Sequence, residues 1–317
     1  MAPTHPRLMF GGSVIGEDYK TVESVKALLE LLQSLGIREI DTAAVYPVPN
    51  MGESERLLGQ LGAIPQGFVI GTKILVLSKE ANGTLEPAKI IDSLSKSRER
   101  LRLDSTQKVG VLHCHAPDFT TPIKDQAATL DSLHKQGLFD KLGVSNFPLD
   151  MLTQFIEVCE REGYVKPTVY QGNYNLLSRG HEKLFPELRK HGIRFDAHSP
   201  VAGGMLSGKL TAGDIQGTRF AKDNMIGTFS KMQYDKKELH DAIRYLTSVL
   251  EPAGVSKIEA GLRWICYHSQ LRPEDGIILG ASKPHYLEEN VASIRKGPLP
   301  DEIVAAIEKT WETLSAQ

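Results

Sequence analysis

Residues 141–162 read K-L-G-V-S-N-F-P-L-D-M-L-T-Q-F-I-E-V-C-E-R-E and contain two different periodicities in succession. The first part, Lys141–Asn146, is a short apolar run of the kind that forms a buried strand. In the second part, Leu149–Glu162, apolar residues recur every three or four positions, which is typical of an amphipathic helix. These apolar positions are Leu152, Phe155, Ile156 and Cys159. The stretch therefore predicts a strand followed directly by a helix.

The same pair of elements recurs along the whole chain. Short apolar runs alternate with segments of helical period, and this alternation favours βα units with a parallel sheet. The predicted strands are Pro6–Gly12, Ile37–Asp41, Phe68–Ile74, Val109–His115, Lys141–Asn146, Val169–Tyr174, Ile193–His198 and Gly276–Ala281. Eight units in 317 residues fit a (β/α)8 TIM barrel, a fold of roughly 250 residues plus insertions.

An open, doubly wound sheet is the alternative architecture. Such a sheet usually carries a G-x-G-x-x-G turn after its first strand. Gly11, Gly12 and Gly16 do not have that spacing. We therefore expect a single α/β domain over residues 1–317, built as a TIM barrel.

One segment interrupts the alternation of strands and helices. Residues 202–235, which follow the seventh predicted strand, are rich in glycine and mostly aperiodic. A connection of this length in a compact domain is usually functional, often as a lid or a binding loop. Extra helices are expected after it, at Lys236–Leu250, behind a capping box formed by Ser256 and Glu259, and at Asp301–Ala316. We predict that the segment is a cofactor and substrate loop.

The composition is that of a globular protein and argues against several classes of function. With 37 Lys+Arg, 39 Asp+Glu and a formal net charge of -2, the chain lacks the basic excess that binds nucleic acid or an anionic membrane. Its three cysteines are too few for a disulfide framework, which fits a reducing compartment. The start of the chain shows no signal peptide, and no apolar stretch is long enough to span a membrane. We expect a cytoplasmic enzyme without a nucleic-acid or membrane partner.

Polar side chains occur where most of the predicted strands end. In a TIM barrel the carboxyl ends of the strands form the catalytic face. Each residue alone also has a structural explanation: Asp41 could cap a helix, Lys73 could be a surface cation, and a histidine could be a hydrogen-bonded core residue. Together they predict a site at one mouth of the barrel. The polar residues at strand ends are Asp41, Tyr46, Lys73, His113, His115, Ser145, Asn146, Gln171, His198, Ser199 and Ser282.

Three of these residues suggest proton donation to a carbonyl oxygen. A tyrosine hydroxyl has a pKa of about 10, which is high for an acid near neutral pH. A neighbouring ammonium stabilises the phenolate and lowers that pKa, and a carboxylate holds the ammonium in place. Tyr46, Lys73 and Asp41 supply one group of each kind. A neutral imidazole could then orient the carbonyl through a hydrogen bond.

Other kinds of chemistry have less support in the sequence. No activated Ser or Cys nucleophile is evident, and neither is a carboxylate pair for glycoside hydrolysis. His113 and His115 could be two metal ligands on one face of a strand. Because no third ligand is indicated, we expect no metal site.

Several motifs resemble those of the aldo-keto reductase superfamily, over essentially the whole chain. They are D-T-A-A-V-Y (41–46), G-T-K (71–73), H-A-P-D (115–118), G-V-S-N (143–146), V-Y-Q-G-N-Y-N (169–175) and G-A-S-K-P-H-Y-L-E-E-N (280–290). Three stretches are similar to the branch of aflatoxin-aldehyde reductases: H-A-P-D, S-P-V-A-G-G-M-L-S-G-K (199–209) and L-R-W-I-C-Y-H-S-Q-L (262–271). The resemblance implies a TIM-barrel enzyme that passes a hydride from NADPH to an aldehyde or ketone.

The resemblance also implies roles for four residues. Tyr46 matches the family's proton donor, Lys73 the partner that lowers its pKa, and Asp41 the partner of that lysine. The family histidine directly precedes A-P-D, which selects His115 over His113. His113 lies where relatives usually carry an apolar or aromatic residue, and an exchange of roles between the two histidines stays open.

The cofactor residues implied by the resemblance fall into three groups along the chain. Ser145, Asn146 and Gln171 match positions that hold the nicotinamide carboxamide. The 199–209 segment matches one that folds over the pyrophosphate, with Lys209 and Arg219 as its expected cations. The site for the 2′-phosphate and adenine is matched by Ser282, Lys283, Glu289 and Asn290. Further expected cofactor contacts are His198, Ser199, Val201, Gly203 and Gly280.

Two positions depart from the family pattern. At His198 the superfamily usually has a tyrosine whose ring stacks on the nicotinamide, and an imidazole offers less area. At Tyr286 many members carry an arginine that binds the 2′-phosphate. Its absence leaves Lys283, with Lys209 or Arg219, to discriminate NADPH from NADH.

The substrate part of the long loop also differs from the nearest relatives. Between residues 225 and 234 the only cation is Lys231, among apolar and aromatic side chains. This composition predicts a bulkier and less acidic carbonyl substrate than a small aldehyde that carries a carboxylate. We expect Phe229, Lys231 and Tyr234 to contact this small molecule.

Two other functions stay open at this point. One is an NADP(H)-binding subunit that senses redox state with little turnover, because the superfamily includes channel-associated subunits. The presence of all four catalytic residue types favours an enzyme instead. The other is an alcohol dehydrogenase that works in the oxidative direction. The resemblance also suggests a homodimer, which no feature of the sequence demonstrates.

Overall fold

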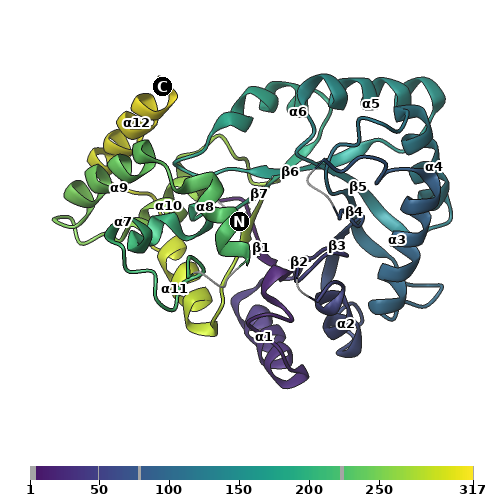
Figure 1. The fold of residues 1–317 in the computed structure, drawn as a ribbon, viewed down its shortest axis with the longest axis horizontal. Coiled ribbons are helices and arrows are strands. Elements are labelled where there is room, and N and C mark those ends of the chain that lie inside the picture. Colours follow the sequence, from purple (N-terminus) through teal and green to yellow (C-terminus); the bar gives the residue numbers. More distant parts are fainter. Residues whose placement is uncertain (1–4, 49, 78–79, 222–224, 317) are drawn as a thin grey trace.

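The protein is built around a closed barrel of eight parallel strands that follow one another in chain order. This computed structural model describes residues 5–48, 50–77, 80–221 and 225–316, with the backbone alone at residues 225 and 226. In Figure 1 the strands lie at the centre and helices α1 to α6 surround them. The predicted (β/α)8 TIM barrel is therefore confirmed.

The elements have the following bounds. The strands are β1 (Arg7–Gly11), β2 (Glu39–Asp41), β3 (Val69–Lys73), β4 (Val109–Cys114), β5 (Phe139–Ser145), β6 (Pro167–Asn173), β7 (Arg194–His198) and β8 (Gly276–Leu279). The helices between strands β1 and β7 are α1 (Val22–Leu35), α2 (Glu53–Gln60), α3 (Pro87–Arg100), α4 (Ile123–Lys135), α5 (Leu149–Glu162) and α6 (Phe185–Lys190). The later helices are α7 (Lys209–Ala212), α8 (Met225–Tyr234), α9 (Lys237–Leu250), α10 (Lys257–Tyr267), α11 (Pro284–Arg295) and α12 (Asp301–Ser315).

Local sequence signals explain where these elements begin and end. Helix α1 begins at a capping box in which the side chains of Thr21 and Ser24 each accept a hydrogen bond from the other's backbone N–H. It ends at Gly36, whose φ of 81° is the left-handed conformation that glycine adopts without strain. All six residues of β4 are buried, because helices cover one face of the barrel wall and the other face forms the barrel interior.

Strands β1 and β8 pair to close the barrel, and a buried carboxylate just before β8 supports this closure. Asp275 is fully buried and accepts two hydrogen bonds from the Arg189 guanidinium of α6, at 2.6 and 2.7 Å. It also accepts from the backbone N–H of Phe195 in β7 at 2.8 Å. Its backbone carbonyl accepts from the N–H of Arg7 in β1 at 2.9 Å. One residue thus joins the first and last strands to their neighbours.

The segment after β7 contains more helix than the sequence analysis predicts. Residues 202–235 include the 3₁₀ helix η3 (Ala202–Ser207), the short α7 and the longer α8. Gly203 and Gly204 adopt φ values of 60° and 96° inside η3, which obscures a helical pattern. Helix α8 contains Gly227, a residue that disfavours helix, so its sequence showed no clear amphipathic period.

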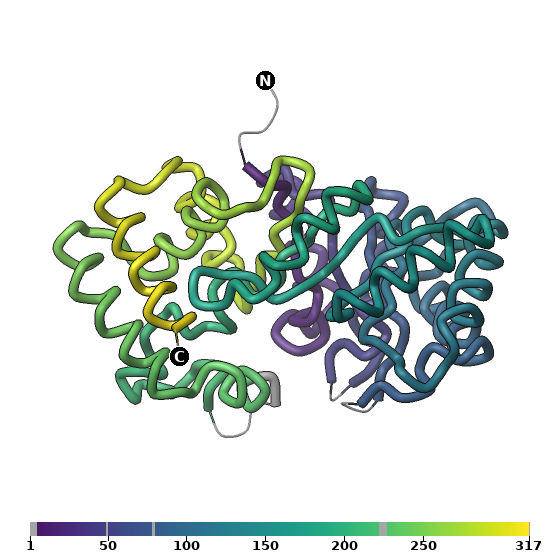
Figure 2. The backbone as a smooth tube through the Cα atoms, turned by 90° about the horizontal axis from the view of Figure 1, so that it is seen from above, coloured from purple at the N-terminus to yellow at the C-terminus, as the bar shows by residue number. Residues whose placement is uncertain are grey.

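The last helices form a lobe beside the barrel. Figure 2 shows the green and yellow part of the chain to one side of the purple-to-teal part. Helix α12 packs against α9. Arg179 joins the lobe to the barrel, because its guanidinium lies 4.1 Å from the ring centre of Trp264 and 5.4 Å from that of Trp311, and it pairs with Glu308 at 2.6 Å.

The three cysteines lie in regular elements, Cys114 in β4, Cys159 in α5 and Cys266 in α10. All three are free thiols and all are buried. None of the helices within the described residues is long and apolar enough to cross a membrane.

Candidate active site

Two neighbouring strands bring a buried ion pair to the barrel mouth. Asp41 is the last residue of β2 and Lys73 is the last residue of β3. Lys73 Nζ donates to both Asp41 carboxylate oxygens, at 2.6 and 2.8 Å, and to the backbone carbonyl of Thr42 at 2.9 Å. The side chain of Lys73 is 1% exposed and that of Asp41 is 6% exposed. Both charges are therefore held away from bulk solvent.

The pair keeps both partners charged despite their burial. Burial alone raises the pKa of Asp41, but the Lys73 ammonium and the hydrogen bonds bring it below the usual value. Burial alone lowers the pKa of Lys73, but the Asp41 carboxylate raises it above the usual value. Gln171 in β6 adds a further hydrogen bond, from Nε2 to Asp41 Oδ1 at 2.8 Å. Gln171, expected to contact the cofactor, thus also holds Asp41.

Tyr46 follows β2 and places its ring beside the ion pair. Lys73 Nζ lies 5.2 Å from the centre of the Tyr46 ring. Burial raises the pKa of the Tyr46 hydroxyl above its usual value, the Lys73 ammonium lowers it, and the Asp41 carboxylate raises it. The lysine acts in the expected direction. Its effect is outweighed mainly by burial, to which the Asp41 carboxylate adds a smaller contribution.

The two histidines near the end of β4 have different environments. His115 lines the pocket with Tyr46, and the two rings meet edge to face with centroids 5.9 Å apart. His113 is 1% exposed and lies inside the barrel beside Lys73 in register, where a side chain at Gly143 would overlap its ring. Burial, with Lys73, lowers the pKa of both to about 3. Both imidazoles are therefore neutral near pH 7, and His115 is the one that reaches the pocket.

The predicted catalytic residues lie at a hollow of about 320 Å³ at the barrel mouth. Asp41, Tyr46 and His115 form one wall of it. Predicted cofactor residues form the other side, namely Ser145, Asn146, Gln171, His198, Ser199, Val201, Gly203, Arg219 and Gly280. His198 Nδ1 lies 3.1 Å from Ser199 Oγ, and burial lowers the pKa of His198 to about 4. The structure thus brings together residues from β2 to β8.

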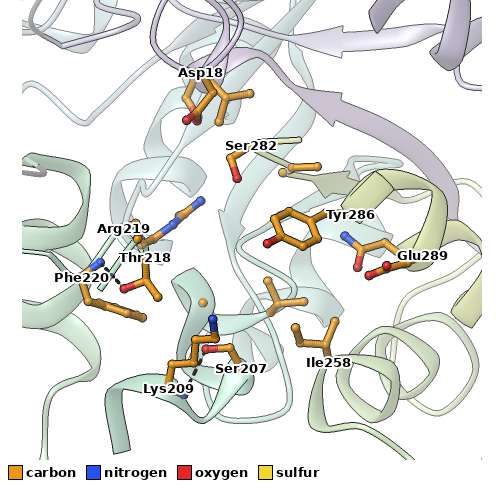
Figure 3. Close-up of a pocket in the computed structure, with 18 of the residues that line it drawn as sticks. Asp18, Ser207, Lys209, Thr218, Arg219, Phe220, Ile258, Ser282, Tyr286 and Glu289 are labelled. Carbon is orange, nitrogen blue, oxygen red and sulfur yellow. Dashed lines mark hydrogen bonds between the residues drawn. The ribbon is translucent and has the colours of Figure 1, made fainter. Parts of the chain in front are cut away.

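A second hollow of about 440 Å³ continues from the first. Both hollows are lined by Ser13, Val14, Val201, Arg219 and Gly280, so they form one cleft. In Figure 3, Arg219 points into this second part from one side and the ring of Tyr286 from the opposite side. The predicted cofactor residues here are Lys209, Ser282, Glu289 and Asn290.

Five predicted site residues lie outside the lining of this cleft, and one of them is Lys73, which is buried against Asp41. Lys283 is exposed, with its Nζ 6.0 Å from the ring centre of Tyr286, at the cleft edge. Phe229 is 59% exposed on α8, and Lys231 lines a separate surface hollow. Tyr234 is buried and its hydroxyl donates to Asn173 Oδ1 at 3.0 Å. It therefore anchors α8 to the end of β6.

Several residues that line the cleft were not predicted from the sequence. Ser13, Val14, Glu17 and Asp18 come from the connection between β1 and α1, where no motif drew attention to them. Burial lowers the pKa of Arg219, and the carboxylates of Asp18 and Glu17 raise it. Ser13, Val14, Glu17 and Asp18 lie just after the first strand, and this position is the signal that could have identified them. The other missed residues include Ser207, Thr218, Phe220, Ser256 and Ile258.

Comparison with known proteins agrees with this geometry. The sequence profile of the Aldo/keto reductase family matches residues 7–312. The chain belongs to the aldo/keto reductase family. It is 33% identical over 294 residues to an aldo-keto reductase of Pseudocercospora fijiensis, which covers 90% of this chain and 97% of that protein. It is also 33% identical to aflatoxin B1 aldehyde reductase member 2 of Mus musculus, over 99% of this chain and 87% of that protein.

A third relative extends the similarity to human proteins. Aflatoxin B1 aldehyde reductase member 4 of Homo sapiens is 32% identical, over 98% of this chain and 95% of that protein. The resemblance to the aldo-keto reductases and to their aflatoxin-aldehyde branch is thus confirmed. Membership of this family supports an oxidoreductase that uses a nicotinamide cofactor.

The residues of the cleft fit such a cofactor. Uncharged hydroxyl and amide groups of Ser145, Asn146 and Gln171 gather at the barrel mouth, where a carboxamide needs hydrogen-bond partners. Arg219 lies where the two hollows join, as a pyrophosphate requires. Gly203, with φ of 60°, would bring a Cβ within 3.0 Å of Ser230 Oγ, so its backbone lies close to α8 as only glycine allows. Among the described residues, no group of His, Cys, Asp and Glu could hold a metal ion.

Proposed function

We propose that the protein reduces an aldehyde or ketone to an alcohol with NADPH. The observation that carries the proposal is the Tyr46 ring beside the buried Lys73–Asp41 pair, edge to face with His115, in the wall of a cleft. A proton donor, a charge that stabilises its conjugate base and a neutral imidazole are the groups that carbonyl reduction requires. When bound, the reduced nicotinamide supplies the hydride.

Tyr46 acts as the general acid in this proposal. Its hydroxyl proton passes to the carbonyl oxygen as the carbonyl carbon is reduced, and the phenolate later regains a proton from solvent. The Lys73 ammonium stabilises this phenolate, and Asp41 keeps the ammonium in position through two short hydrogen bonds. His115, neutral at pH 7, donates a hydrogen bond that orients the carbonyl.

The preference for NADPH rests on cations in and near the second hollow. Lys209 and Arg219 line it, and Lys283 lies beside Tyr286 at its edge. Each can offer charge to a 2′-phosphate, whereas the ring of Tyr286 offers none. We therefore expect NADPH to bind more tightly than NADH. Parallel fluorescence titrations of the two cofactors measure this difference, and equal affinities would contradict the preference.

Replacing Tyr46 by phenylalanine tests the assignment of the acid. Tyr46→Phe removes only the donated proton, so turnover of an aromatic aldehyde should fall by about 10²- to 10⁴-fold. NADPH binding, followed by fluorescence, should stay within a factor of two. Tyr245→Phe, the same change on the outer helix α9, is the control and should keep full activity.

The outcomes separate the candidate functions. Unimpaired turnover in Tyr46→Phe would contradict Tyr46 as the acid. A wild-type protein that binds NADPH but turns over no carbonyl would favour a redox-sensing subunit. Faster oxidation of the alcohol with NADP⁺ at physiological concentrations would favour a dehydrogenase.

A further inference from the structure

Asp118 is a fully buried carboxylate that accepts six hydrogen bonds. Its Oδ1 accepts from the backbone N–H of Gly83, Thr120 and Thr121, at 2.9, 2.9 and 3.3 Å, and from the Thr120 hydroxyl at 2.7 Å. Its Oδ2 accepts from the backbone N–H of Leu85 at 2.9 Å and from the Thr121 hydroxyl at 2.7 Å. The proposed mechanism uses none of these contacts.

These hydrogen bonds join two neighbouring loops at the catalytic face. Gly83 and Leu85 belong to the connection between β3 and α3, whose strand ends at Lys73. Thr120 and Thr121 belong to the connection between β4 and α4, which begins with His115. Gln126 in α4 donates to the Asp118 carbonyl at 3.0 Å and fixes the same turn from its other side. Asp118 thus holds both loops in a fixed relation.

The His115 ring depends on this backbone for its orientation. Its Nδ1 is buried and has no hydrogen-bond partner among the described residues. The ring meets that of Tyr46 edge to face, with centroids 5.9 Å apart, a contact that holds neither ring nitrogen by a hydrogen bond. A catalytic imidazole is commonly oriented by a hydrogen bond to its second nitrogen. In this protein the fixed backbone of residues 115–118, which includes Pro117, orients the ring in place of such a hydrogen bond.

We propose that Asp118 is a positioning residue, which acts through His115 by clamping the turn that follows it. The expected effect on kcat rests on the proposed carbonyl reduction, whereas the expected effect on the position of His115 does not. The clamp requires an anion with acceptors on both oxygens. The hydrogen bonds from Thr121, Leu85 and Thr120 outweigh burial and hold the pKa of Asp118 well below its usual value. Asparagine at this position would replace one carboxylate oxygen by an NH₂ group. That group cannot accept hydrogen bonds from the N–H and O–H groups that the oxygen binds.

Asp118→Asn is the first test variant. With the turn loosened, kcat for an aldehyde should fall about tenfold or more, because misplacing a catalytic group by about 1 Å can cost 10²-fold in rate. NADPH affinity should stay within a factor of two, since Asp118 does not line the cleft. The primary isotope effect with deuterium-labelled NADPH should rise as hydride transfer becomes rate-limiting. A mere loss of folded protein would leave that isotope effect and KM unchanged.

A spectroscopic signal tests the link to His115 without using activity. In protein labelled with ¹³C-histidine, the ring resonance of His115 should move or broaden in Asp118→Asn. The resonance of His113, enclosed in the barrel, should stay in place. Single His→Gln variants assign the two signals. The matched control is Asp131→Asn, because Asp131 is also a buried carboxylate that accepts from a backbone N–H, that of Val165 at 2.9 Å, before β6 begins and away from the mouth.

The results distinguish the two proposals from each other. A shifted His115 resonance with a lower kcat supports the positioning role. An unchanged His115 resonance and kcat in folded Asp118→Asn would overturn it. A shifted resonance in a protein whose wild type reduces no carbonyl would keep the positioning role and reject the proposed function. If Asp118→Asn does not fold, Thr120→Val, which removes one hydroxyl from the clamp, carries the same test with a smaller expected change.

Discussion

His113 is a titratable side chain enclosed at the level of the buried ion pair. Both of its ring nitrogens are buried without a hydrogen-bond partner among the described residues. Burial, with the nearby Lys73 ammonium, lowers its pKa from 6.5 to about 3. In the unfolded chain the same imidazole takes up a proton near pH 6.5. Folding therefore excludes a proton that the unfolded chain binds, and this penalty grows as pH falls from 6.5 toward 3.

Replacing His113 by leucine should make the unfolding free energy depend less strongly on pH below about 6.5. Between pH 6.5 and 5.0, the unfolding free energy of the wild type should fall by about 2 kcal/mol more than that of His113→Leu, since each pH unit costs about 1.4 kcal/mol per excluded proton. Urea denaturation at several pH values measures both curves. Parallel curves for the two proteins would show that His113 is protonated in the folded state.

Single residues of the site differ in how well the sequence reveals them. Asp41, Tyr46, Lys73 and His115 follow predicted strands and belong to motifs, so their convergence could be predicted. A motif match alone predicts different positions for His113 and His115, because residues two apart on one strand point to the same side. Only the register with Lys73 and the space at Gly143 show that His113 is enclosed.

At the scale of elements, α8 is the part that the sequence described least well. Contact of Phe229, Lys231 and Tyr234 with substrate stays a prediction, and the structure adds that Tyr234 anchors the helix. The Tyr234 hydroxyl bonds Asn173, and Asn175 donates to that hydroxyl at 3.2 Å. Such contacts join residues about 60 positions apart. Local periodicity carries no information about them.

Gly227 lets α8 pack directly against the backbone of Arg219, which lines the cleft. A Cβ at this position would overlap the backbone carbonyl of Arg219. Gly227→Ala should therefore displace Arg219 and weaken NADPH binding roughly tenfold, about 1.4 kcal/mol. Alanine favours helix over glycine, so a loss of helicity would not explain such a result.

Fluorescence titration with NADPH measures the effect of Gly227→Ala. Turnover at saturating cofactor should be largely retained, because the Tyr46 site lies outside the altered contact. Met232→Ala, on the same helix with a side chain that is 64% exposed, is the control and should bind NADPH normally. Wild-type affinity in Gly227→Ala would mean that the position of Arg219 does not matter for binding.

At the scale of the whole molecule, barrel closure depends on a few long-range contacts. Counting strand and helix units was enough to predict the TIM barrel, because each unit is local in sequence. The long-range contacts that support closure of the barrel could not be predicted by counting such local units. Asp275 binds Arg189, which is 86 positions away, and its carbonyl binds the N–H of Arg7 in the first strand.

Asp275→Ala should destabilise the whole barrel. It leaves the Arg189 guanidinium and two backbone N–H groups without their acceptor, and breaking such a buried pair costs about 3–5 kcal/mol. The midpoint of urea unfolding should fall accordingly. Asp241→Ala, which removes an exposed partner of Lys237 and Arg244 on α9, should cost less than about 1 kcal/mol. Equal losses in the two variants would contradict a special role for Asp275 in closure.

The burial of the three cysteines has a consequence for the protein's own chemical durability. Burial raises the pKa of Cys114, Cys159 and Cys266 to about 12, so at neutral pH each remains a protonated thiol. The thiolate is the form that attacks electrophiles. An enzyme proposed to handle reactive aldehydes thus keeps its sulfur atoms both sheltered and un-ionised. We therefore expect aldehydes that enter the cleft to form few adducts with these thiols.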